Sequence, residues 1–187
     1  MKKVVLISGA WGGRKDFLLI NYHLKNKFKT SYFKYNTLLT EKIEKISKQL
    51  QKFIQKQTSE NEKVDILALS AGGIIADYYL KFIDNHKVEN FVSVCSPFNG
   101  TPIAYLFPKT IFKGISQLRK NTNFLRKLNN KSPKTNQLNI WSKYDILVPG
   151  YSGQGPQPHH TYFFLHPIIH FFPPIIKRLK RFLLNNN

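Results

Sequence analysis

Ser70 is the residue whose surroundings most clearly allow covalent chemistry. It stands in Ala68-Leu69-Ser70-Ala71-Gly72-Gly73, after the apolar run 64–67 and before a stretch with helical periodicity. A sharp strand-to-helix turn strains a serine and projects its hydroxyl, and small neighbours let the strand and the helix pass closely. A turn with an ordinary capping serine fits the same residues, so the motif alone leaves both readings open.

A serine hydroxyl becomes a good nucleophile when a base takes its proton and an acid orients that base. Downstream of Glu89 the chain contains a single acid, Asp145, which lies just after the apolar run 138–141. The second half of the chain has no other acid, and this one follows a predicted strand. This position favours a catalytic acid over an acid in an ordinary surface turn.

Histidines close to the end of the chain supply the base. His159 and His160 follow a Gly- and Pro-containing loop at 150–158 and both fit by position. His166 and His170, at apolar helical spacing, are expected in the core or on the surface. We predict that His160 is the base, carried on a loop that reaches Ser70.

These residues need a scaffold of strands and helices. Apolar runs rich in β-branched and aromatic residues predict interior strands at 4–8, 64–69, 90–95 and 138–141, with a weaker one at 31–35. Helical spacing predicts a helix after a Thr40 cap and another from Ser70 to Ile83. Nearly uniformly apolar strands that alternate with helices indicate a mostly parallel sheet with helices on both faces.

Four segments, in order, resemble the small bacterial lipases and esterases of the α/β-hydrolase superfamily, whose elbow also reads Ala-x-Ser-x-Gly. Residues 64–73 are similar to the elbow, 94–102 to the segment that follows it, 141–148 to the acid segment and 160–164 to the base segment. The resemblance implies a minimal three-layer α/β-hydrolase fold and a triad of Ser70, Asp145 and His160.

The same resemblance implies where an oxyanion would be stabilised. One donor is the backbone N–H of Ala71, which follows the nucleophile. The second comes from the loop after the first strand, with Ala10 as the expected donor and Trp11 as the alternative.

We expect one domain over residues 1–187, because a chain of this length builds one sizeable core. Residues 97–136 form the longest stretch without a predicted strand and are expected to cover the substrate. The single cysteine, Cys95, lies in an apolar run and is expected to be a buried structural thiol. No cofactor and no metal are expected, since no metal-binding spacing of Cys or His is present.

The chain is strongly basic, with a formal net charge of +19. Residues 90–187 contain 13 Lys or Arg and one acid. Such a surface favours contact with anionic membranes, whereas no nucleic-acid motif is present, and a Lys-rich composition without a partner is equally compatible. Residues 174–184 could lie on a membrane as an amphipathic helix, but a final helix packed on the sheet is favoured.

The predicted function is therefore hydrolysis of carboxylic esters, as in a lipase or esterase, through an acyl-enzyme on Ser70. The alternatives are an acyltransferase with the same triad and a non-catalytic protein that binds anionic surfaces on a hydrolase scaffold. Because no signal segment or membrane span is recognised, we expect a cytoplasmic protein that can contact a membrane peripherally. The oligomeric state is left open.

Overall fold

The computed structural model describes residues 1–84, 86–132, 134–153, 159–162 and 173–185. Six strands form one sheet in the order β2-β1-β3-β4-β5-β6, and all five strand pairs are parallel. The strands are β1 (Lys2–Ile7), β2 (Phe28–Tyr32), β3 (Val64–Leu69), β4 (Val88–Val94), β5 (Asn136–Ser142) and β6 (His159–Tyr162). The predicted parallel sheet is confirmed.

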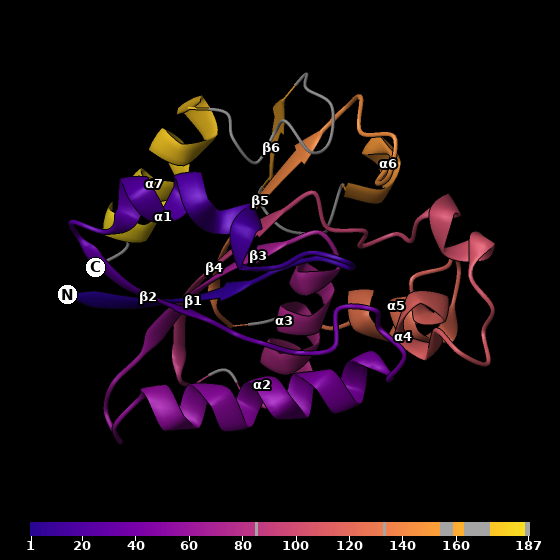
Figure 1. The fold of residues 1–187 in the computed structure, drawn as a ribbon, viewed down its shortest axis with the longest axis horizontal. Helices are drawn as coiled ribbons and strands as arrows, with labels where there is room; N and C mark the ends of the chain where they lie inside the picture. Colours follow the sequence, from indigo (N-terminus) through magenta and orange to yellow (C-terminus); the bar gives the residue numbers. More distant parts are fainter. Residues whose placement is uncertain (85, 133, 154–158, 163–172, 186–187) are drawn as a thin grey trace.

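Helices cover both faces of this sheet, as Figure 1 shows. One face packs against α2 (Ile43–Gln57) and α3 (Ala71–Phe82), and the other against α1 (Leu18–Leu24) and α7 (Pro173–Asn185). This is the expected three-layer architecture. The remaining elements are the short 3-10 helices η1 (Arg14–Phe17) and η2 (Pro102–Leu106) and the helices α4 (Lys113–Gln117), α5 (Asn123–Asn129) and α6 (Gly150–Gly153).

Strand β3 is buried on both faces, and five of its six side chains are apolar. Every residue of β3 is buried, and the cores on the two faces take alternate residues of the strand, such as Ile66 on one side and Leu67 on the other. A strand covered on both faces needs such a largely apolar sequence. The order of the strands places the ends of β3, β4 and β5 side by side, so residues that follow these strands meet at one edge of the sheet.

Helix α7 completes the second face. Its residues Ile175, Ile176, Leu179 and Leu183 are buried in the core that also contains strand residues and α1. The apolar side of this helix is therefore occupied by the protein itself, as the packed final helix predicts. Among the described residues, no helix combines the length and the apolar character that a membrane crossing needs.

Several local predictions are corrected by the structure. Helix α2 begins at Ile43 with Lys42 as its N-cap, and not after a Thr40 cap. The Thr40 hydroxyl instead accepts the side-chain N–H of Asn36 at 2.7 Å, and the first helical N–H, that of Ile43, donates to Gln117 Oε1 at 2.8 Å. A contact from the distant α4 thus caps this helix, and no local pattern could predict it.

Two strands also differ from the sequence prediction. The weak strand expected at 31–35 is β2, which starts three residues earlier at Phe28. Its register pairs Lys2 with Phe28 and Leu6 with Tyr32, so pairing with β1 fixes its bounds. Strand β6 was not predicted, because His159-His160-Thr161-Tyr162 lacks a continuous apolar run.

Candidate active site

Ser70 occupies the turn between β3 and α3 in a backbone conformation that residues with a side chain seldom adopt. Its φ is 50° and its ψ is −125°. The N–H of Ser70 donates to the carbonyl of Val94 at 2.8 Å, and its own carbonyl accepts the N–H of Gly73 at 2.9 Å. The surrounding structure thus holds a strained residue in place, as active sites commonly do. The sharp strand-to-helix turn predicted around Ser70 is confirmed.

The small residues around Ser70 are required by close backbone approaches. A Cβ at Gly72 would lie 2.4 Å from the Ser8 carbonyl oxygen and 2.6 Å from that of Ile7, so only glycine lets α3 pass the end of β1. A Cβ at Gly9 would lie 2.7 Å from Cβ of Ser70. The loop after β1 therefore lies directly against the serine.

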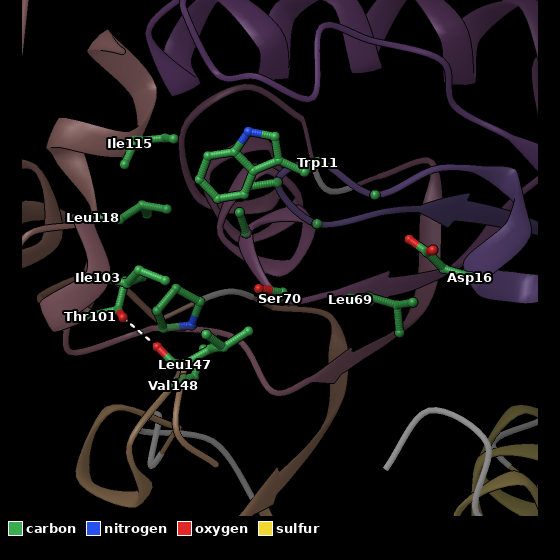
Figure 2. A pocket seen from close by; sticks show the side chains of 15 residues that line it. Trp11, Asp16, Leu69, Ser70, Thr101, Ile103, Ile115, Leu118, Leu147 and Val148 are labelled. Carbon is green, nitrogen blue, oxygen red and sulfur yellow. Dashed lines mark hydrogen bonds between the residues drawn. The ribbon is translucent and has the colours of Figure 1, made fainter. Parts of the chain in front are cut away.

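A cavity of about 270 Å³ opens beside Ser70. Figure 2 shows the serine near its centre, with Ile103, Ile115 and Leu118 to one side and Asp16 to the other. Trp11 also lines it. Apolar side chains therefore form one end of the cavity and a carboxylate lies at the opposite end, so an acyl chain fits the first end and a polar group the second.

Both predicted oxyanion donors, Ala10 and Ala71, line this cavity together with Ser70. Ala71 is the first residue of α3, where helical N–H groups lack intrahelical partners and the helix dipole favours negative charge. The alternative donor is disfavoured, because the N–H of Trp11 donates to the carbonyl of Thr37 at 2.9 Å. Ala10 therefore remains the proposed second donor.

Hydrogen bonds fix the loop that carries Ala10. The hydroxyl of Tyr35 donates to the Ser8 carbonyl at 2.8 Å, and burial, then the nearby Tyr32, raise the pKa of the Tyr35 hydroxyl well above its usual value. The N–H of Gly12 donates to the carbonyl of Gly9 at 3.2 Å. Such a loop can present a backbone donor without reorganising during a reaction, which is what oxyanion stabilisation requires.

Asp16 is a cavity residue that the sequence analysis missed. Its Oδ2 accepts the N–H of Gly13 at 2.9 Å, and Asp16 is the third residue of η1, whose N-cap is Gly13. An acid three residues after the N-cap is the spacing of a capping box, and this signal could have indicated its role in the sequence. Asp16 thus ties η1 to the loop that carries Ala10.

Asp145 is buried just beyond the end of β5. Its Oδ1 accepts the N–H groups of Leu147 at 2.9 Å and Val148 at 2.8 Å. The side chains of these two residues line the cavity with Ser70. The carboxylate thus holds in place two residues that form the wall of the cavity.

Cys95 directly follows β4 and is buried, as predicted. Its φ is 50°, and its N–H donates to the carbonyl of Ile140 at 2.8 Å, so β4 ends in the same way as β3. Burial, then the nearby Asp145 carboxylate, raise the pKa of its thiol well above the usual value. A neutral buried thiol is a poor nucleophile, so this residue does not compete with Ser70. The carboxylate that the prediction assigned to the triad thus faces the end of β4, next to the strand that carries Ser70.

His160 lies within β6, and not on a loop as the sequence analysis expected. Leu69, Val94, Ile140 and His160 are paired in successive strands at one register. Three strand spacings place the backbone of His160 about 14 Å from that of Leu69. His166 and His170 lie outside the described residues. The register therefore weighs against His160 as a direct proton acceptor from Ser70, while its assignment remains a prediction.

Residues of the segment predicted to cover the substrate, 97–136, form the apolar end of the cavity. The hydroxyl of Thr101 donates to the carbonyl of Leu147 and joins the segment to the loop of Asp145. Within the segment, the N–H of Thr101 donates to the carbonyl of Leu118 at 2.8 Å. The rings of Trp11 and Phe107 lie 4.8 Å apart, so the segment also contacts the loop after β1. Its role as a cap stays a prediction.

A family model described as palmitoyl protein thioesterase matches residues 19–113, just over half of the chain. The matched residues include β3, Ser70 and α3. No curated protein sequence matches the chain.

Solved structures share the fold over nearly its whole length. The mature lipase BlEst2 of Bacillus licheniformis has a TM-score of 0.75 at 15% identity, over 98% of this chain and 89% of the lipase. A monoacylglycerol lipase of Paleococcus ferrophilus has a TM-score of 0.73 at 13% identity, over 99% and 95%. MGS-MChE2, an α/β-hydrolase enzyme from a lagoon-sediment metagenome, has a TM-score of 0.71 at 18% identity, over 98% and 90%. These similarities show the α/β-hydrolase fold.

Proposed function

This chain belongs to the palmitoyl protein thioesterase family, and from that premise we propose that it is a serine hydrolase that cleaves acyl esters through an acyl-enzyme on Ser70. The observation that carries the proposal is the position of Ser70. It is a strained residue between a strand and a helix, it opens onto a largely apolar cavity, and Ala10 and Ala71 lie beside it.

The proposed reaction proceeds in two steps. The Oγ of Ser70 bonds to the acyl carbon while a histidine takes its proton, and the N–H groups of Ala10 and Ala71 stabilise the oxyanion. The bond to the alcohol then breaks and the alcohol leaves with the proton from the histidine. In the second step a water molecule attacks the acyl-enzyme by the same route and releases the carboxylic acid and free Ser70.

Asp145 is the proposed acid of this triad, because it is buried beside the ends of β4 and β5 and is the only acid after Glu89. His160 is the predicted base. Proton transfer requires about 3 Å between the serine oxygen and an imidazole nitrogen, which the register of β6 makes demanding for His160. Replacing each of His159, His160, His166 and His170 by alanine in turn identifies the base, since only its loss abolishes formation of the acyl-enzyme.

A thioester is the second candidate substrate, and the family match favours it. The acyl-enzyme is the same for both substrates; only the leaving group, an alkoxide or a thiolate, differs. An acyltransferase would also form this intermediate and pass the acyl group to an acceptor other than water. The proposed binding partners are therefore lipid-like acyl substrates and an anionic membrane surface on which they lie.

Hydrolysis of a series of nitrophenyl esters and matched acyl thioesters by the purified protein tests this proposal. Wild type is expected to release free acid, and Ser70→Ala to reduce kcat by at least about 10³-fold, as loss of a triad serine does. A single-turnover release of the leaving group without free acid, followed by continuous formation of a new ester once an alcohol is added, would indicate a transferase. Equal rates for wild type and Ser70→Ala would reject the hydrolase proposal.

A further inference from the structure

Exposed apolar side chains gather around the opening of the catalytic cavity. Among the described residues, twelve large apolar side chains are exposed, and nine of them lie in the loops that follow the carboxyl ends of the strands. We call these loops, residues 8–17, 33–42, 95–122 and 143–153, the carboxyl-edge rim. Soluble monomers seldom expose so many large apolar residues in one region without a partner.

Contacts place several of these exposed residues beside the cavity. Trp11 lines it, and its ring packs on Phe107, which directly follows Leu106 at the end of η2. Ile146 lies between the buried Asp145 and the cavity residue Leu147. Leu106 is 77% exposed and Ile146 is 78% exposed. The two most exposed apolar side chains of the rim are therefore close to the wall of the cavity: Ile146 directly precedes Leu147, and Leu106 is connected to Trp11 through Phe107.

Leu38 and Ile111 extend this apolar surface. Leu38 lies between Thr37, whose carbonyl accepts the N–H of Trp11, and Leu39, whose carbonyl accepts the N–H of Gly114. Ile111 directly precedes the half-buried Phe112, whose ring lies 5.2 Å from that of Phe107. Hydrogen bonds and ring contacts thus connect the rim loops to one another and to α4.

The charge of the rim determines what can cover it. Exposed cations lie between the apolar residues, among them Arg14, Lys34, Lys109, Lys113 and Lys143. The three acids in the described rim, by contrast, are buried or half-buried, and one of them, Glu41, is paired with Lys45. A partner must therefore be anionic at its surface and apolar beneath it.

We propose that the carboxyl-edge rim docks on an anionic lipid bilayer, so that the apolar side chains enter the headgroup region, the cations contact lipid phosphates and the acyl substrate reaches Ser70 from the membrane. This inference rests on the proposed function for its substrate. The proposed membrane-binding surface is the rim and not α7, because the apolar residues of α7 are buried in the protein. Nucleic acid matches the charge but leaves Leu106, Ile111 and Ile146 without a partner.

Sedimentation with vesicles tests the proposal, and the Ser70→Ala protein keeps the lipid intact during the measurement. Vesicles of phosphatidylglycerol mixed with phosphatidylcholine are expected to bind the protein, and pure phosphatidylcholine to bind it weakly. Since each cation near an anionic surface contributes roughly a fivefold factor, neutralising Lys109, Lys113 and Lys143 with glutamine should weaken binding about 100-fold. The matched control neutralises Lys48, Lys52 and Lys56 on α2, which are also exposed.

An apolar variant separates a bilayer from other anionic partners. Leu106→Ser, Ile111→Ser and Ile146→Ser together should abolish most vesicle binding, whereas Leu18→Ser with Tyr22→Ser on α1, outside the rim, should leave it unchanged. None of the three rim residues lines the cavity. The same three substitutions in a protein that keeps Ser70 should therefore retain activity on a soluble short-chain ester. That activity also shows that the variant is folded.

If the α2 substitutions weakened vesicle binding as much as the rim substitutions, the proposal would be overturned, because binding would then depend on net charge alone. Undiminished binding by the triple serine variant would also overturn it, and stronger binding to duplex DNA than to the vesicles would assign the rim to nucleic acid. Failure of the proposed function gives a different result: no Ser70-dependent hydrolysis of the soluble ester, with rim-dependent vesicle binding unaffected.

Discussion

Gly9 and Ser70 lie so close that a Cβ on residue 9 would be 2.7 Å from the Cβ of the serine. The two residues belong to different loops, one after β1 and one after β3, which are neighbouring strands of the sheet. The proposed oxyanion donor Ala10 follows Gly9 directly. The distance between the serine and the proposed donor is thus set by a contact that tolerates no side chain.

Gly9→Ala should therefore impair catalysis more than folding. The added methyl group must push Ser70 or the loop aside, and a displacement of about 1 Å can cost about 100-fold in rate. We expect kcat for a soluble ester to fall by about this factor, measured beside the thermal midpoint. Gly13→Ala is the control, because a Cβ at Gly13 meets nothing within 4 Å, and it should leave kcat unchanged. Similar losses in both variants would contradict the contact as the cause.

Asp16 should act as a positioning residue for the oxyanion loop. Asp16→Ala removes the acceptor of the Gly13 N–H, and kcat should fall about tenfold with a smaller change in KM, since loss of a whole oxyanion donor costs about 10²–10³. Asp16→Asn keeps an oxygen acceptor and should restore most of the rate on a neutral ester. If the asparagine variant is as slow as the alanine variant, the charge matters instead of the hydrogen bond to Gly13.

The apolar end of the cavity should set the length of the acyl chain. Ile103→Trp places an indole inside the cavity, so kcat/KM for a dodecanoyl ester relative to a butyryl ester should fall about tenfold or more. Leu106→Trp adds the same ring on η2 outside the cavity and should leave the ratio unchanged, with esters kept below the concentration at which they aggregate. An unchanged ratio in the Ile103 variant would locate the acyl chain elsewhere.

Asp65 should make folding stability depend on pH in mildly acidic solution. Burial raises the pKa of this carboxyl to about 6, although its Oδ1 accepts the backbone N–H of Asn90 at 3.1 Å and the side-chain N–H at 2.8 Å. In the unfolded chain the Asp65 carboxyl ionises near its ordinary pKa of about 3.9, whereas in the folded chain it keeps its proton until about pH 6. The free energy of unfolding should therefore fall as the pH rises across this interval, by up to about 3 kcal/mol.

Urea unfolding at several pH values measures that decline. Asp65→Asn removes the carboxyl while keeping an oxygen for the two Asn90 donors, so the free energy of unfolding should decline less steeply over the same interval. A residual decline is expected from the buried Asp77, because burial also raises the pKa of its carboxyl, against the effect of Lys81. Parallel curves for wild type and Asp65→Asn would contradict the assignment.

The interior strands were predictable because burial on both faces leaves a run of mostly apolar residues in the sequence. Strands β1, β3, β4 and β5 were found in this way, and the Ser70 turn followed from its small residues. Strand β6, with two histidines and a threonine, lacks that signal and is defined by pairing with β5. The expected Thr40 cap failed for a related reason, since a distant glutamine, Gln117, caps α2.

The candidate site was predictable where sequence order alone brings residues together. Ser70, Ala71 and Asp145 follow strand ends, and the structure places them at one edge of the sheet. The hydrogen bond from the Trp11 N–H to Thr37 is a contact between loops, which no local pattern records, whereas the role of Asp16 has a local signal in its capping-box spacing. The placement of His160 depends on a register that only the folded sheet reveals.

The most direct measurement of the central claim is the site of covalent labelling by a fluorophosphonate, located by mass spectrometry of the intact protein and its peptides. The account predicts one adduct per chain on Ser70, none on Ser70→Ala, and slower labelling when Asp145 is replaced by asparagine. Labelling of Ser70→Ala at the wild-type rate, or a properly folded wild type that takes up no label, would contradict it.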